Sequence, residues 1–255
     1  IEVVKLHCEH NGDFPHNPEP LKKNLTDLSN KVLECNADLG IAVDPDVDRL
    51  VFMCENGELF GEENTLVACA DYVLSKTPGT TVSNLSSSRA LNDITQKHNQ
   101  VHFYSAVGEV NVVNKMKKHN AIIGGEGNGG VIYPESHYGR DSIVGIGLFL
   151  SLYVERGLTA SKLLETYPKY YMLKEKINLS PSIEIDKILD KIAQKYKSEK
   201  IDLVDGVRID FIDSWVQLRK SNTEPIIRIY SEAITIEKAK NLIKDVEVLI
   251  DEIIN

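Results

Sequence analysis

The sequence lacks several features that would place it in a specialised class of protein. Its four cysteines, Cys8, Cys35, Cys54 and Cys69, show neither CxxC spacing nor the density of a disulfide-stabilised secreted domain. No apolar run reaches membrane-spanning length, and the first residues lack the basic and then apolar pattern of a signal peptide. The net charge of −9 excludes a broad basic surface for nucleic acid. These absences predict a cytoplasmic protein with reduced thiols and with no membrane or nucleic-acid partner.

Strand-like and helix-like segments alternate over the first two-thirds of the chain. Residues 2–8 have the pattern of a strand with nothing ahead of it, which suggests that the chain is a fragment. The later segments are a helix capped by Thr26 at 26–34, a strand at 39–43, two strand runs around Asn56-Gly57, helices at 62–76, 88–98, 108–118, 141–155 and 159–167, and strands at 80–86, 101–107 and 121–127. This alternation predicts α/β domains with a mixed, mostly parallel sheet covered by helices.

The pattern changes after Pro168. A strand at 170–179 and an amphipathic helix at 182–198 precede β segments over 201–231, and a helix with one apolar stripe follows at 235–253. This order predicts a C-terminal α+β domain after the α/β part.

The stretch IAVDPDVDRLVF places three carboxylates, Asp44, Asp46 and Asp48, at alternate positions after an apolar run. Arg49 follows them directly. At this spacing an extended backbone sends the three side chains the same way, and Pro45 keeps Asp44 out of the helical region. Because like charges repel, the simplest partner is a hard divalent cation with oxygen ligands, which predicts a Mg²⁺ site shared with a phosphate.

This acidic loop has other interpretations. An EF-hand calcium loop is rejected because its sixth position is Arg49 instead of glycine and its flanks are strands. A phosphatase of the haloacid-dehalogenase type, with Asp44 as nucleophile, fits a strand followed by Asp-x-Asp but needs a lysine and a later acidic pair that the sequence does not identify. The non-functional alternative is a solvated acidic turn.

A second loop, GGEGNGG at 124–130, surrounds Glu126 and Asn128 with five glycines. The bare backbone lets a ligand approach closely, and a carboxylate there can accept hydrogen bonds from a sugar diol. The alternative is a flexible turn with an exposed acid.

A third loop opens the stretch RKSNTEPIIRIY with five consecutive donor side chains: Arg219, Lys220, Ser221, Asn222 and Thr223. Arg228 follows on the next strand-like segment. A dense donor cluster that contains arginine forks suits a phosphate dianion. The alternative is a basic surface hairpin.

In this order, DPDVDR, GEGNG and RKSNTEP resemble the metal, sugar and distal-phosphate loops of the α-D-phosphohexomutase family, which includes phosphoglucomutase, phosphomannomutase and phosphoglucosamine mutase. DFPHNPEP at 13–20 also resembles the segment that precedes the metal loop there. The resemblance implies a phosphotransferase that interconverts hexose 1-phosphate and 6-phosphate through a bisphosphate. In that family a phosphoserine exchanges the phosphoryl group while Mg²⁺ stabilises its charge.

The family fold has four domains, so the resemblance implies that residues 1–61 belong to the second domain, 62–168 form the third and 169–255 form the C-terminal α+β domain. The first domain, with its phosphoserine, would be missing. Pro15 precedes His16 where that loop has serine, so we assign no nucleophile. We therefore expect this piece to be inactive alone, with the missing N-terminal domain, hexose phosphate and hexose 1,6-bisphosphate as its partners.

The resemblance also implies roles for single residues. Asp44, Asp46 and Asp48 would bind Mg²⁺, and Arg49 would act as a catalytic residue near the transferring phosphate. The implied substrate-binding residues are Glu126 and Asn128 for the sugar, and Arg219, Ser221, Asn222, Thr223 and Arg228 for the non-reacting phosphate.

The chain departs from the family pattern at several positions. Ser86 and Glu109 stand where some members have a lysine and a histidine, so the general acid and base are not assigned, and Arg89 and His137 are candidates.

In the sugar loop, Asn128 and Gly130 stand where many members carry a serine and then a histidine. The glycine-rich loop is more similar to phosphoglucosamine-type or archaeal-type members, which favours glucosamine phosphate over mannose or glucose phosphate. The alternatives are a dehalogenase-type sugar phosphatase and a sugar-phosphate-binding module without catalysis.

Overall fold

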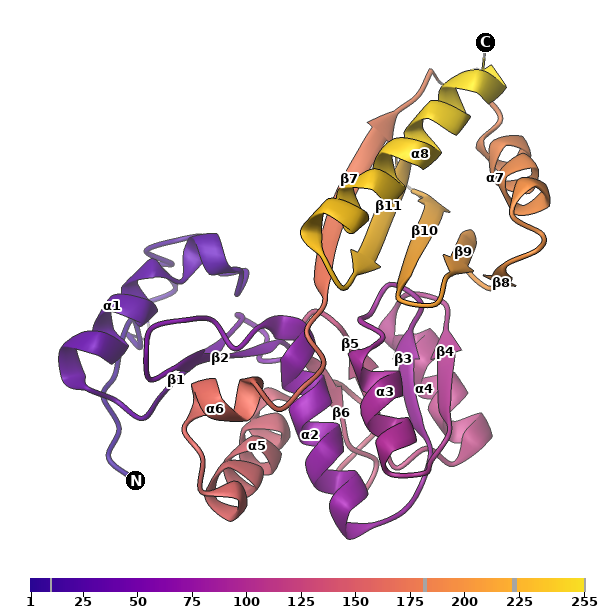
Figure 1. The fold of residues 1–255 in the computed structure, drawn as a ribbon. Helices are drawn as coiled ribbons and strands as arrows, with labels where there is room; N and C mark the ends of the chain where they lie inside the picture. The colour runs from indigo at the N-terminus through magenta and orange to yellow at the C-terminus, as the bar shows by residue number, and fades with distance from the viewer. Residues whose placement is uncertain (10, 181–182, 222–223, 255) are drawn as a thin grey trace. The chain divides into compact units, whose positions relative to one another are not determined.

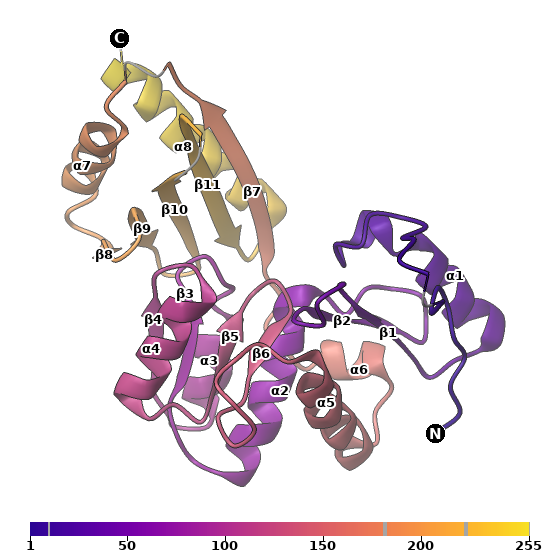
Figure 2. The same ribbon diagram turned by 180° about the vertical axis from the view of Figure 1, so that it is seen from behind.

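The computed structural model describes residues 1–255 except 10, 181–182, 222–223 and 255. It divides into two compact units, each described below by itself (Figures 1 and 2). The first unit comprises Ile1–Tyr104 and Gly108–Pro168, and the second comprises Ser105–Val107 and Lys169–Asn255. No helix among the described residues is both long enough and apolar enough to cross a membrane.

The helices and strands follow one another as η1 (Lys22–Asn24), α1 (Thr26–Cys35), β1 (Leu39–Val43), β2 (Leu50–Cys54), α2 (Glu62–Lys76), β3 (Thr81–Asn84), α3 (Ala90–Lys97), β4 (His102–Ser105), α4 (Glu109–His119), β5 (Ile123–Glu126), β6 (Gly130–Ile132), α5 (Ser142–Arg156), α6 (Ala160–Leu164), β7 (Tyr171–Asn178), α7 (Ile185–Lys195), β8 (Lys200–Asp202), β9 (Val207–Asp210), β10 (Ser214–Lys220), β11 (Ile226–Ala233) and α8 (Ile236–Ile254).

The first unit begins with an antiparallel hairpin of β1 and β2, in which Val43 pairs with Leu50. Helix α1 covers the hairpin, since its Val32 packs with Val51 and Met53 of β2 in a buried cluster. The acidic sequence DPDVDR is therefore the connection between two paired strands. The pairing fixes both ends of that loop.

A sheet of order β4-β3-β5-β6 lies beside this hairpin in the first unit, with β3 and β5 parallel and β6 antiparallel. Consecutive residues of β5 face opposite sides of the sheet. A Cβ on Gly124 would meet Met116 of α4, whereas a Cβ on Gly125 would meet Leu66 of α2. Helices α4 and α2 thus cover opposite faces, and the glycines let them pack closely on β5.

Aromatic side chains fasten the hairpin to the rest of the first unit. The ring of Phe52 on β2 stacks on Phe149 of α5 with centroids 3.7 Å apart, and Phe60 packs edge-on against both rings. All three side chains are at most 1% exposed. Burial of such rings contributes about 1.5–3 kcal/mol each, so the acidic loop is anchored to the scaffold that carries the GGEGNGG loop.

The second unit is an antiparallel sheet of order β7-β11-β10-β9-β8. Helices α7 and α8 bury the apolar residues of one face, including Val216, Leu218 and Ile229. On the other face Arg208 lies over the ring of Trp215, 4.1 Å from its centroid.

The predicted class, α/β followed by α+β, is confirmed, and most predicted elements occur within a few residues of their expected bounds. Three details were wrong. Residues 2–8 form no strand, since no described strand pairs with them, and they are almost entirely exposed. Thr26 is the first helical residue of α1 instead of its cap, because Leu25 occupies the cap position. The turn at Asn56-Gly57 forms, but the second strand run shrinks to a single bridge between Met53 and Leu59.

Candidate functional site

The loop between β1 and β2 is shaped by its own first carboxylate. Asp44 Oδ1 accepts hydrogen bonds from the backbone N–H groups of Asp48 and Arg49, both at 3.0 Å. The backbone N–H of Asp44 donates to the carbonyl of Arg49 at 3.3 Å. Val47, inside the turn, has a positive φ of 59°. Asp44 is 8% exposed, so this part of the loop is fixed from within.

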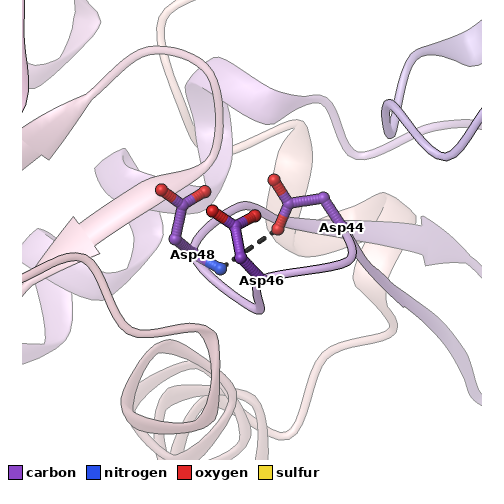
Figure 3. Close-up of side chains that lie close together, drawn as sticks. All are labelled: Asp44, Asp46 and Asp48. Atoms are coloured by element: carbon purple, nitrogen blue, oxygen red, sulfur yellow. Dashed lines mark hydrogen bonds between the residues drawn. The ribbon is translucent and has the colours of Figure 1, made fainter.

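The three aspartates gather on one side of this loop (Figure 3). Asp44, Asp46 and Asp48 each offer an oxygen within 4.8 Å of the others. Asp48 Oδ1 is buried and has no hydrogen-bond partner among the described residues. A set of carboxylate oxygens with one unsatisfied member fits a hard divalent cation such as Mg²⁺, which would satisfy that oxygen and offset the repulsion.

The surroundings of Asp48 favour its protonated form when no cation is present. The pKa of Asp48 is raised to about 6, mainly by burial and also by the charges of Asp44 and Asp46, while Arg140 opposes the shift. A divalent cation would act in the same direction as Arg140, because it stabilises the ionised carboxylate. A cation at this loop would therefore compete with a proton.

Arg49 lies across the same loop. Its Nε is 3.5 Å from Asp44 Oδ2 and 3.8 Å from Asp48 Oδ1, and its Nη1 is 3.4 Å from Glu19 Oε1. The side chain is 33% exposed, so part of the guanidinium still faces solvent. Glu19 belongs to the DFPHNPEP stretch, which thereby contacts the acidic loop.

Glu126 ends β5 and is 5% exposed. Its Oε1 accepts from Asn84 Nδ2 at 2.7 Å and from the Gly108 N–H at 3.0 Å, and its Oε2 accepts from Arg140 Nη1 at 3.1 Å. A carboxylate has about four acceptor positions, so three donors from the chain leave one open. The carboxylate is held rigidly and is not the loosely placed acid that a glycine-rich loop suggests.

The side chain of Arg140 connects the acidic loop to Glu126 of the GGEGNGG loop. This side chain precedes α5 and is 15% exposed. Its Nη1 donates to Glu126, its Nη2 to Asp48 Oδ2, and its Nε to Glu109 Oε2 at 2.9 Å. The three carboxylates come from three separate segments, so one guanidinium fixes their mutual positions.

The backbone of the GGEGNGG loop also contacts β2. The Leu50 N–H donates to the Gly129 carbonyl at 3.0 Å. Gly129 has a φ of 92°, and a Cβ there would lie 2.4 Å from the Leu50 carbonyl oxygen, so only glycine fits. Asn128 Oδ1 accepts from the Gly130 N–H at 3.2 Å, which closes the loop locally.

The candidate acids and bases are in different surroundings. His137 is half-exposed and its Nε2 lies 2.8 Å from Asp141 Oδ2. Arg89 occupies the cap position of α3, and Ser86 is buried with its N–H donating to Asn84 Oδ1 at 3.0 Å. Glu109 is held by Arg140 at the first turn of α4. Glu109 is joined through Arg140 to Asp48 and Glu126.

The predicted phosphate-binding residues lie in the second unit. Arg219 of β10 pairs in register with Arg228 of β11, which pairs with Lys176 of β7. Arg219 Nε is 3.6 Å from Asp205 Oδ2, whereas neither Arg228 nor Lys176 forms an ion pair with another described residue. Like charges opposite one another destabilise a sheet, so this row of three cations favours an anionic ligand.

The remaining members of the predicted phosphate loop separate. Lys220 faces the helical side of the sheet, where its Nζ is 3.0 Å from Asp186 Oδ2 of α7. Ser221 is 7% exposed, and its N–H donates to the Ile226 carbonyl at 3.1 Å. Asn222 and Thr223 lie outside the described residues.

Comparison with known proteins identifies the family. Three family models match in succession: Phosphoglucomutase/phosphomannomutase alpha/beta/alpha domain II over residues 1–57, alpha/beta/alpha domain III over 62–170, and the C-terminal domain over 177–248. The chain belongs to the phosphoglucomutase/phosphomannomutase family. The acidic loop and Glu126 thus fall in the matches to domains II and III, and Arg219 and Arg228 fall in the match to the C-terminal domain.

Individual relatives agree with this assignment to the mutase family. The chain is 37% identical over 247 residues to a phosphoglucomutase/phosphomannomutase from Thermococcus kodakarensis, covering 95% of the chain and 54% of the relative. It is 34% identical over 246 residues to a probable phosphoglucosamine mutase from Methanopyrus kandleri, covering 94% and 54%. A crystal structure of a family protein from Burkholderia thailandensis matches with a TM-score of 0.85 at 25% identity, covering 98% of this chain and 55% of that one. The chain therefore spans about half the length of the curated relatives it matches.

Three residues in these contacts were missed by sequence reasoning. Asn84 ends β3 next to β5, and the rule that ligands gather at the carboxyl ends of parallel strands could have indicated it. Lys176 could have been found only from the register of β7 with β11. Arg140 carries no local signal, because its three partners lie 14 to 92 positions away in the chain.

Proposed function

We propose that this chain supplies the metal, sugar and phosphate loops of a Mg²⁺-dependent phosphohexomutase that interconverts hexose 1-phosphate and 6-phosphate through a bisphosphate. Turnover would also need a phosphoserine from outside these 255 residues. The single observation that carries the proposal is the cluster of Asp44, Asp46 and Asp48, tied through Arg140 to Glu126, in a chain of the mutase family. We also keep the division into 1–61, 62–168 and 169–255 as a proposal.

Each loop would have its own task. The three aspartates would hold Mg²⁺, which supplies electrostatic stabilisation to a transferring phosphoryl group. Arg49 has a partly exposed guanidinium beside these aspartates, where it could donate to the same phosphoryl oxygens. Glu126 would accept a hydrogen bond from a sugar hydroxyl at its one open acceptor position, and Asn128 would line the same loop.

In the second unit, Arg219 and Arg228 would bind the non-reacting phosphate, with Ser221, Asn222 and Thr223 in the adjoining turn. Lys176 adds a third cation to their row. A phosphate dianion would neutralise most of this charge, and charge-assisted hydrogen bonds to it are worth about 1.5–3 kcal/mol each.

We favour glucosamine phosphate as the hexose substrate. The support is the glycine-rich GEGNGG loop and the name of the Methanopyrus kandleri relative, a probable phosphoglucosamine mutase. The Thermococcus kodakarensis relative is named for glucose and mannose, so those phosphates are the comparison substrates. The free state of all four cysteines supports action in a reducing compartment such as the cytoplasm.

The geometry does not favour the phosphatase alternative. A nucleophilic aspartate needs an oxygen that is free to attack. Asp44 is buried, its Oδ1 accepts from two backbone N–H groups, and its Oδ2 lies 3.5 Å from Arg49 Nε, so both oxygens already have partners. Release of phosphate from a sugar phosphate by this chain, abolished in Asp44→Asn, would favour the phosphatase over the mutase.

Calorimetry with glucosamine 1,6-bisphosphate tests the mutase proposal. We expect binding that requires Mg²⁺ and that weakens about 10- to 100-fold in Arg219→Ala, since one charge-assisted contact is lost. Lys220→Ala is the matched control, because this neighbouring cation faces α7 and should leave binding within about twofold. No binding with Mg²⁺ present, or equal binding by Arg219→Ala, would contradict the proposal.

A further inference from the structure

Arg140 lies at the centre of an excess of negative charge. The guanidinium groups of the cluster are those of Arg49 and Arg140, and its carboxylates are those of Glu19, Asp44, Asp46, Asp48, Glu109 and Glu126. Six carboxylates against two guanidiniums leave a formal charge of −4. The cluster therefore has charge available for a divalent cation even with Arg140 in place.

Gly130 makes the position of Arg140 possible. A Cβ on Gly130 would lie 2.3 Å from Arg140 Cδ, closer than two carbon atoms can approach. The stem of Arg140 thus runs through the space that a side chain at position 130 would occupy. The backbone of Gly130 does not have a positive φ, so its conformation does not require glycine. The physical reason for a glycine here is the space that the Arg140 stem occupies.

The two oxygens of Asp48 have different surroundings. Oδ2 accepts from Arg140 Nη2, while Oδ1 is buried without a hydrogen-bond partner among the described residues. Arg140 also holds Glu126 by Nη1 and Glu109 by Nε, so its planar fork has little freedom to turn. The guanidinium therefore restricts the rotation of the Asp48 carboxylate.

We infer that Arg140 is a positioning residue for the cation site: it holds Asp48 by one oxygen so that the carboxylate stays with Asp44 and Asp46, and it fixes Glu126 relative to that site. This inference rests on the proposed function. Partners that orient a ligating carboxylate are worth about 10- to 100-fold in metal affinity.

A second view of Arg140 predicts the opposite sign. If the guanidinium acted only as a nearby positive charge, it would repel the cation, and its removal would tighten cation binding. A positioning role predicts that removal weakens binding. The direction of the change therefore separates the two.

The test compares Mn²⁺ binding by the whole 255-residue chain with Mn²⁺ binding by its Arg140→Met variant. Binding is measured as the loss of the electron paramagnetic resonance signal of free Mn²⁺. Mn²⁺ uses the same oxygen ligands as Mg²⁺. Work at about pH 8 keeps the carboxylates ionised in both proteins, so a change in protonation cannot account for the result. The control is Arg156→Met, which removes another arginine from a buried carboxylate, Asp71 at 3.0 Å.

We expect Arg140→Met to weaken Mn²⁺ binding about 10- to 100-fold, while Arg156→Met stays within about twofold of the unmodified chain. Gly130→Ala keeps the guanidinium but displaces its stem, so it should weaken binding in the same direction. In the Arg140→Met background Gly130→Ala should add almost nothing, since the displaced group is gone. If Arg140→Met does not melt cooperatively, Gly130→Ala decides the question.

Unchanged or tighter Mn²⁺ binding by folded Arg140→Met would overturn the inference, as would a Gly130→Ala variant that binds like the unmodified chain. These outcomes leave the proposed function standing. Failure of the unmodified chain to bind Mn²⁺ at all would instead refute the cation site, and with it the proposed function.

Discussion

Acidification should weaken cation binding at the aspartate loop with a midpoint near the pKa of Asp48. Burial, reinforced by Asp44 and Asp46, raises this pKa to about 6 in the absence of a cation. The cation binds the ionised carboxylate, so proton and cation compete. One pH unit below the pKa only about one carboxylate in eleven is ionised, which lowers the apparent affinity roughly tenfold, or about 1.4 kcal/mol. Above about pH 7 the affinity should be constant.

The same shift predicts how pH affects the fold without a cation. The pKa of Asp48 lies at about 6 in the folded chain, above its ordinary value of 3.8, so the folded state binds more protons than the unfolded state. The stability that Asp48 contributes is therefore present below its ordinary pKa and is lost as the pH rises through 6. Added Mg²⁺ should restore stability at the upper end of this range.

Two measurements check this reasoning. Mn²⁺ affinity recorded from about pH 5 to 8 should show the midpoint in the unmodified chain and lose it in Asp48→Asn, which should bind more weakly throughout. Without metal, thermal unfolding should show the unmodified chain losing stability relative to Asp48→Asn as the pH rises from about 4 to about 6, with no further relative change above about pH 7. An affinity that is flat from about pH 5 to 8 in the unmodified chain, or a midpoint that survives in Asp48→Asn, would refute the argument.

Three further predictions concern the scaffold of the site. The carboxylate of Asp141 caps α5 by accepting a hydrogen bond from a backbone N–H at 3.0 Å. Asp141→Ala should therefore lower the free energy of unfolding by about 1 kcal/mol in denaturant titrations. Gly129→Ala should lower the free energy of unfolding by more than about 2 kcal/mol in the same assay, because a Cβ there would lie 2.4 Å from a backbone carbonyl of β2. Its control is Gly147→Ala, which should leave the free energy of unfolding unchanged or raise it, because a Cβ at this position of α5 would meet open space. Burial raises the pKa of Cys54 and of Cys69 to about 12, so a thiol reagent at about pH 8 should label the two exposed cysteines quickly and these two only on unfolding.

Local patterns in the sequence predicted the elements and the acidic loop well. Alternation of apolar runs predicted the α/β part, and the change of pattern after Pro168 predicted the α+β part, because both signals are properties of neighbouring residues. The grouping of Asp44, Asp46 and Asp48 likewise follows from spacing along one short loop. The prediction failed at residues 2–8, where strand-like composition has no partner strand among the described residues to complete its hydrogen bonds.

Contacts between distant segments were beyond such reasoning. The sequence suggested that Glu126 stands in bare backbone, whereas Asn84, Gly108 and Arg140 already occupy three of its acceptor positions. Register across three strands likewise decides which cations of the second unit form a row. Alternation of side chains along β10 then places Lys220 on the face opposite Arg219. Charge density along a sequence does not say which face a side chain takes.

Gly130 and Arg140 show why a departure from a family pattern is best interpreted in pairs. Taken alone, a glycine at a position where the family resemblance leads one to expect a histidine suggests that a function has been lost. In the structure the space beside Gly130 is filled by the stem of Arg140, and its guanidinium brings a permanent positive charge to Asp48, Glu109 and Glu126. A histidine at position 130 would begin with a Cβ 2.3 Å from that stem, so the arginine stem would have to move. Gly130 therefore leaves open the path along which a cationic group from the start of α5 reaches the cluster.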